Sequence, residues 1–121
     1  GWKTGYRIRS STGEEEALSG VECTGFIPIK YGQTLTLENV KATSTGNHSI
    51  AFYKSDYSFI AGSYLSDWMF SSGGGSVLDG TSVSKIVSGK ISSSTLTEDS
   101  GIAFVRSSAS EITNNSVVTI T

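Results

Sequence analysis

The sequence has little of what most metal, catalytic and nucleic-acid sites are built from. Its 121 residues include one Cys, one His and one Pro, and only 17% are charged. A single cysteine excludes an internal disulfide and a cysteine-based metal site, and a single histidine excludes a site built on several histidines. The formal net charge of -2 gives no electrostatic basis for binding nucleic acid. We therefore expect no nucleic-acid partner, no metal and no cofactor.

Long apolar runs and leader-like segments are also missing. No stretch approaches the ~20 apolar residues that span a bilayer, so membrane insertion is not expected. The first residues do not include a positively charged segment followed by an apolar stretch, which a signal peptide has, so no targeting signal is visible. Because the chain starts at Gly1, we expect residues 1–121 to be a single domain taken from a longer protein.

Small and hydroxyl-bearing residues are abundant instead. The chain has 23 Ser, 13 Thr and 14 Gly, but its 36% hydrophobic and 10% aromatic residues are enough for a packed core. Runs of helix-forming residues are scarce, and only the acidic segment 14–18 has local helix propensity. This composition predicts an all-β domain with many turns.

Strand-like patterns recur about every 8–12 residues, which is typical of a sandwich or barrel of about eight strands. Alternation predicts that Tyr6, Ile8, Leu35 and Leu37 face a core, and that a strand ends near Pro28. Further strands are expected within these segments: 49–53, 58–61, 83–87, 101–106 and 116–120. The polar stretch 54–57 between the first two of these predicts a hairpin.

The remaining motifs favour no enzyme. The glycines at 73–75 lack the Lys-Ser/Thr pair of a phosphate-binding loop, so we interpret them as a connection. The three glutamates at 14–16 are expected to be solvated, and His48 to be a surface turn residue. No nucleophile-elbow sequence is present, so we predict a non-catalytic domain with no catalytic residues.

The aromatic residues give the one hint of a ligand. A small core can absorb those on the inward phase of the strands, which are Tyr6, Phe26, Phe52, Phe59 and Phe104. Tyr57, Tyr64 and Trp68 fall outside this set, near Asp56 and Asp67. Exposed rings can stack on the apolar face of a sugar while carboxylates accept its hydroxyls, so these five residues are the predicted binding site. The alternative is that Trp68 packs in the core and the tyrosines hold no ligand.

Several segments resemble the small β-sandwich modules of phage and prophage tail or baseplate proteins. The resemblance rests on a G-Y-R-x-x-S opening, a strand and turn of the F-I-P-V-K-x-G type, a hairpin of the I-x-F-Y type and a closing strand. The matching segments are 5–10, 24–34, 50–60 and 102–106. Gln33 and Lys54 stand where Asp is common in such modules. The resemblance implies a jelly-roll-like antiparallel sandwich used in adhesion or carbohydrate recognition.

Together these observations predict a carbohydrate-binding or host-surface-recognition module. The expected partners are a cell-surface glycan or polysaccharide, other domains of the parent protein and, in a homo-oligomer such as a trimer, further copies of the chain. The expected location is the virion tail or the cell exterior. The alternative is a structural assembly module of a tail fibre or baseplate that has no glycan ligand.

Overall fold

A computed structural model describes most of the chain, and its regular structure is almost entirely antiparallel β-sheet. The described residues are 1–31, 33–38, 40, 45–65, 83–86, 90–91, 94–96, 98–114 and 116–120. The predicted loop at 73–75 lies outside them. Glu98–Ser100 forms a short 3-10 helix, and in the described ranges no helix is long and apolar enough to cross a bilayer. The all-β prediction is therefore confirmed.

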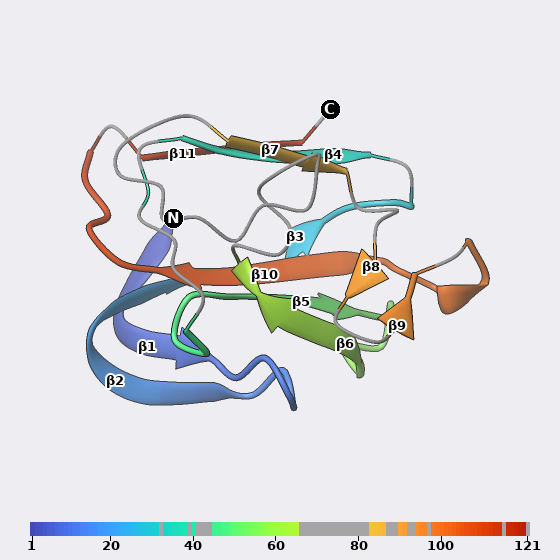
Figure 1. Cartoon of the computed structure of the whole chain (residues 1–121), viewed down its shortest axis with the longest axis horizontal. Coiled ribbons are helices and arrows are strands. Elements are labelled where there is room, and N and C mark those ends of the chain that lie inside the picture. Colours follow the sequence, from blue (N-terminus) through green and yellow to red (C-terminus); the bar gives the residue numbers. More distant parts are fainter. Residues whose placement is uncertain are drawn as a thin grey trace.

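The larger sheet has six strands in the order β1-β2-β10-β5-β6, and β3 also pairs with β10 (Figure 1). Its strands are β1 (Trp2–Ile8), β2 (Glu15–Thr24), β3 (Ile27–Pro28), β5 (Ser49–Tyr53), β6 (Phe59–Tyr64) and β10 (Phe104–Ala109). The hairpin β5–β6 was predicted from its polar turn, and β3 ends at Pro28 as expected. The strand expected at 101–106 begins three residues later and runs to Ala109.

A three-stranded sheet in the order β11-β4-β7 lies alongside the larger one (Figure 1). It consists of β4 (Thr34–Glu38), β7 (Val83–Ile86) and β11 (Val117–Ile120), and a separate pair is formed by β8 (Lys90–Ile91) and β9 (Ser94–Thr95). Leu35 and Leu37 of β4 are buried, as the alternation predicted. They share one hydrophobic cluster with Ile50 and Phe52 of β5, so the main core lies between the two sheets.

The opposite face of the larger sheet is covered too. Ile8 and Cys23 form a second cluster there with Ala51 and Tyr53. The hydroxyl of Tyr53 donates to the carbonyl oxygen of Gly13 at 2.6 Å, so the turn between β1 and β2 folds over this face. The Tyr53 side chain is only 2% exposed because this turn covers it. Burial raises the pKa of Tyr53 to about 12, so the phenol stays protonated.

Buried serines hold the first strand onto the sheet. The Ser108 hydroxyl accepts a hydrogen bond from the amide of Ile8, and the Ser49 hydroxyl donates to the Ile8 carbonyl. The two hydroxyls also lie 2.7 Å apart, and both side chains are fully buried. The serine-rich composition predicted many turns, but Ser49 and Ser108 lie on strands. Their hydroxyls replace the ladder partners that the end of β1 would otherwise lack.

Candidate functional site

Aromatic side chains gather on the outer face of the larger sheet, near the turn that joins β5 to β6. Phe26 lies at the centre, with its ring centroid 4.8 Å from that of Tyr53 and 4.9 Å from that of Tyr57, both edge to face. The Tyr57 ring stacks on Phe104 at 4.9 Å with an interplanar angle of 13°. We call Phe26, Tyr57 and Phe104 the aromatic patch. Its offset-stacked and edge-to-face contacts are the favourable arrangements for aromatic rings.

The aromatic patch is open to solvent although its rings pack together. Tyr57 is 57% exposed and Phe26 is 39% exposed. Phe26 was expected in the core, which is wrong, because Ile27 is the residue that packs against the main core. Since Phe104 covers one face of the Tyr57 ring, we infer that the other face contributes most of this exposure. Exposed clusters of large apolar groups are a common mark of a binding surface.

The β5–β6 turn presents Tyr57 in an unusual backbone conformation. The amide of Tyr57 donates to the carbonyl of Lys54 at 2.9 Å, and its φ is 70°. Bulky residues rarely adopt this left-handed region, which costs roughly 1–2 kcal/mol. Contacts of the Tyr57 ring with Phe26 and Phe104 offset this cost. The strained backbone therefore holds an aromatic ring at this position.

Asp56 stands beside Tyr57 in the same turn. Its Oδ1 atom accepts hydrogen bonds from the amide of Ser58 at 3.0 Å and from the Ser58 hydroxyl at 2.6 Å. These bonds hold the pKa of the Asp56 carboxyl below its usual range, so the group is ionised at neutral pH. Because both bonds use Oδ1, the second carboxylate oxygen can accept a hydrogen bond from a ligand hydroxyl.

Arg106 supports the aromatic patch from beneath. Its guanidinium lies 4.7 Å from the centre of the Phe26 ring, and the side chain is almost fully buried. Nε and Nη2 donate to the carbonyl oxygen of Thr24 at 3.0 and 2.8 Å, and Nη2 also contacts Glu15 Oε1 at 2.8 Å. This anchoring fixes the backbone just before Phe26, so Arg106 positions the ring. Nothing in the sequence singled out Arg106.

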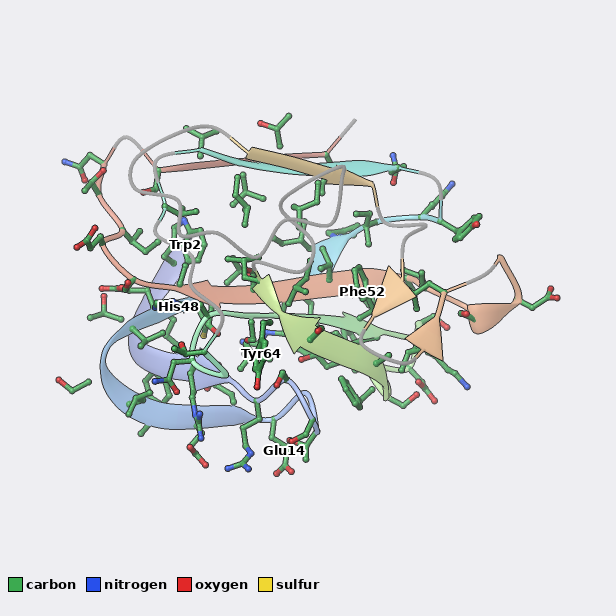
Figure 2. The ribbon with its side chains drawn as sticks, in the orientation of Figure 1. Trp2, Glu14, His48, Phe52 and Tyr64 are labelled. Carbon is green, nitrogen blue, oxygen red and sulfur yellow. The ribbon has the colours of Figure 1, made fainter. Side chains whose placement is uncertain are left out.

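The predicted site residues do not all come together. Tyr57 lies in the turn of the β5–β6 hairpin, whereas Tyr64 pairs with Ser49 at its far end. At about 3.3 Å per strand residue the two tyrosines are roughly 20 Å apart, so one sugar ring cannot touch both. Tyr64 is 42% exposed, and Figure 2 shows it on the same side of the sheet as Glu14. Asp67 and Trp68 lie outside the described residues.

His48 is buried rather than at the surface, which corrects the expectation from its loop-like sequence. It is 8% exposed, its amide donates to the Thr45 carbonyl at 3.1 Å, and its carbonyl accepts from the amide of Leu65 at 2.6 Å. In the described part of the chain, no three His, Cys, Asp or Glu side chains are grouped so that they could hold a metal ion.

Two of the three consecutive glutamates hold ion pairs, although the sequence suggested that all three are solvated. Glu15 contacts Arg106 and Lys3, each at 2.8 Å, and Glu16 contacts Arg7 at 2.6 Å and Arg9 at 3.0 Å. Hydrogen bonds from Lys3 and Arg106 hold the pKa of the Glu15 carboxyl below its usual range. Hydrogen bonds from Arg7 and Arg9 do the same for the Glu16 carboxyl. The segment 14–18, which has local helix propensity, therefore enters a strand at Glu15. Ion pairs with residues of β1 and β10 stabilise the extended conformation there.

We expect the domain to lose stability as the pH falls below about 4.5. A carboxyl whose pKa is lower in the folded chain stabilises the fold above its unfolded pKa, near 4.5, and this contribution is lost as the pH falls through the folded value. Urea unfolding between pH 7 and pH 2.5 measures the effect, and E15Q should flatten the acid limb. E14Q is the matched control. An equally steep acid limb in E15Q would contradict this role.

No protein-family model, curated protein or solved structure matches this chain significantly.

Proposed function

We propose that this domain is a non-catalytic carbohydrate-binding module that stacks a sugar ring on Tyr57. The observation that carries the proposal is a ring more than half exposed, held in a strained turn and backed by Phe104. A pyranose presents an apolar face of C–H groups, which binds well to an aromatic ring whose position is already fixed. Phe26, which is partly exposed beside Tyr57, extends this platform.

Asp56 supplies the polar half of such a site. Sugar hydroxyls are hydrogen-bond donors, and an ionised carboxylate is a strong acceptor for them. The turn fixes Asp56 through Ser58, so little side-chain entropy is lost when a sugar binds. Tyr64 lies at the far end of the hairpin and is therefore proposed as a contact for another unit of a longer glycan. Asp67 and Trp68 remain sequence predictions for the same ligand.

We further propose that the two facing sheets form a jelly-roll-like sandwich belonging to a phage or prophage tail protein that recognises a host-surface glycan. The shared core of the two sheets and the resemblance of the sequence to tail modules support this. The competing proposal is an assembly module in which the aromatic patch packs against another chain. Light scattering of the wild type and of Y57N separates the two, since a stable oligomer that Y57N disrupts would show that the patch packs against another chain.

The glycan proposal is tested with the variant Y57N. Asparagine tolerates the left-handed conformation, so this change removes the ring but keeps the turn. The wild-type domain is first screened on an array of bacterial surface polysaccharides, and its best ligand is then titrated calorimetrically. We expect Y57N to weaken binding at least tenfold and D56N to weaken it several-fold.

The matched control is Y64N, which removes another exposed tyrosine from the same hairpin. Because Tyr64 is proposed to contact only a longer glycan, this comparison uses a short fragment of the best ligand, for which the affinity of Y64N should differ less than twofold from that of the wild type. Thermal unfolding of each variant confirms that the fold is kept. Full affinity in Y57N would rule out Tyr57 as the stacking residue, and the absence of any array ligand would favour the assembly proposal.

A further inference from the structure

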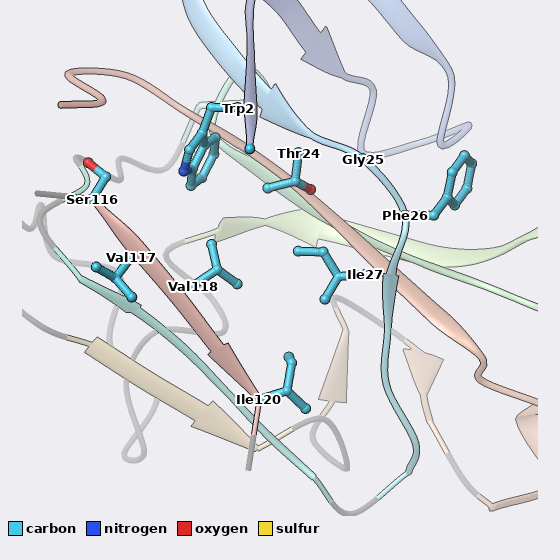
Figure 3. A pocket seen from close by; sticks show the side chains of 10 residues that line it. Trp2, Thr24, Gly25, Phe26, Ile27, Ser116, Val117, Val118 and Ile120 are labelled. Atoms are coloured by element: carbon cyan, nitrogen blue, oxygen red, sulfur yellow. The ribbon is translucent and has the colours of Figure 1, made fainter. Parts of the chain in front are cut away.

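A pocket opens between the two sheets, away from the aromatic patch. It lies where the start of β1 and the link between β2 and β3 face strand β11 of the smaller sheet (Figure 3). Its volume is about 480 Å³, which is within the range of small-molecule sites in proteins. Phe26 is among the residues around this pocket, but its ring points away from it in Figure 3, whereas Ile27 points into it. The pocket and the aromatic patch therefore lie on opposite faces of one segment.

The strand pairing explains why the space between the sheets is open here. β11 is at the end of the smaller sheet, and β1 begins at Trp2, opposite Thr24. The next strand residues, Ile27 and Pro28, pair with β10, and among the described residues no strand pairs with them on their other side. Core residues at this edge are therefore left partly exposed.

The chemistry of the walls defines what can bind. Most of the surface is apolar and comes from the indole of Trp2 and the side chains of Ile27, Val118 and Ile120. All four pack at the margin of the main core and are only partly buried. Thr24 and Ser116 add hydroxyl groups, and none of the described lining residues has a charged side chain, although Gly1 also lines the pocket and its amino group is charged when it is the free N-terminus. Burying an ionised group here would cost much free energy, whereas an apolar group would displace water from apolar walls.

We propose that this pocket binds a neutral ligand whose apolar body, a ring or a short acyl group, fills the space beside Trp2, and whose polar end reaches the hydroxyls of Thr24 or Ser116. This site is separate from the proposed glycan contact at Tyr57, because the two lie on opposite faces of residues 25–27. The occupant is a small molecule or substituent, since the lining suits an uncharged apolar group and offers a few polar partners for orientation.

The test uses N-phenyl-1-naphthylamine, a neutral fluorescent probe, with a W68F form of the chain in which Trp2 is the only tryptophan. We expect saturable binding with energy transfer from Trp2 to the probe, and competition by 1-octanol. With the Gly1 amino group acetylated, sodium octanoate, at a pH where it is ionised, should compete at least tenfold more weakly than 1-octanol. Absence of saturable binding, or equal competition by the two compounds, would overturn the proposal.

Two neighbouring positions on β11 give a matched pair of variants. V118F should fill the pocket and weaken probe binding at least tenfold, whereas T119F places the same ring on the exposed side of the strand and should leave binding within twofold. If V118F does not fold, G25L takes its place, because a Cβ at Gly25 meets no atom within 4 Å. Unchanged probe affinity in the folded pocket variant would overturn the assignment.

Oligomer formation provides a separate check. If the domain forms a concentration-dependent dimer that excludes the probe, the edge is an interface between copies of the chain and the small-ligand proposal is wrong. Analytical ultracentrifugation with and without probe distinguishes the cases. We expect Y57N to bind the fluorescent probe as tightly as the wild type does. Loss of glycan binding in Y57N therefore tests the glycan proposal, and loss of probe binding in V118F tests the pocket proposal.

Discussion

Replacing Gly62 with alanine should destabilise the domain by about 3 kcal/mol, which is at the upper end for overpacking by one methyl group. A Cβ at this position on β6 would lie 2.5 Å from the carbonyl oxygen of Ser10 and 2.9 Å from that of Ile50. Both are backbone atoms, so neither can rotate away as a flexible side chain would. The turn between β1 and β2 would have to lift off the sheet, and the cluster around Tyr53 would loosen with it.

Urea unfolding followed by tryptophan fluorescence measures this loss for G62A. The matched control is G25A, because a Cβ at Gly25 meets no atom within 4 Å and the φ of this residue is not positive. We expect G25A to stay within about 0.5 kcal/mol of the wild type, as is usual for changes without a steric or polar mechanism. Equal stability of G62A and G25A would show that the β1–β2 turn does not pack on β6 in this way.

Replacing Arg106 with alanine should cost about 3 kcal/mol, the upper end of the range for leaving a buried hydrogen-bonding group without its partner. The substitution removes both hydrogen bonds to the Thr24 carbonyl and the ion pair with Glu15, which leaves the carbonyl and the carboxylate without these partners. It also removes the cation beneath Phe26, so the aromatic patch loses part of its support.

The control for R106A is R9A. Arg9 also pairs with a glutamate, at 3.0 Å, but its side chain is 42% exposed, so R9A should cost less than about 1 kcal/mol. R106K separates charge from geometry, since lysine keeps the cation but cannot reproduce the forked hydrogen bonds; we expect most of the loss to remain. A cost for R106A no larger than that for R9A would contradict the anchoring role of Arg106.

Local sequence patterns predicted much of the fold because strand formation, tight turns and the side of a strand that faces the core depend on neighbouring residues. The run 50–53 is continuous and apolar, and the structure has a fully buried strand over 49–53, followed by the expected hairpin. Alternation likewise placed Leu35 and Leu37 correctly. The pattern could not show that β1 and its turn cover the outer face of the sheet, because that depends on contacts between residues far apart in the chain, such as Gly13 and Tyr53.

The candidate site was predicted in part for the same reason. Tyr57 and Asp56 were expected from their place in a polar turn, and both are exposed there. Phe26 was missed, although a signal was present: Ile27 and Ile29 share one side of an extended segment, which directs Phe26 to the other. Arg106 could not be found, because its contacts with Glu15 and Thr24 span more than 80 residues and follow from strand pairing alone.

Ring-selective NMR of the carbon-13-labelled domain tests the central proposal most directly. The best polysaccharide fragment from the array is added to the wild type, and the Tyr57 signals are identified by their absence from Y57N. We predict that the ring signals of Tyr57 and Phe26 shift progressively and saturate with the ligand, while those of the buried Phe52 stay in place. Saturable binding of the glycan with no shift at Tyr57 or Phe26 would contradict the proposed site.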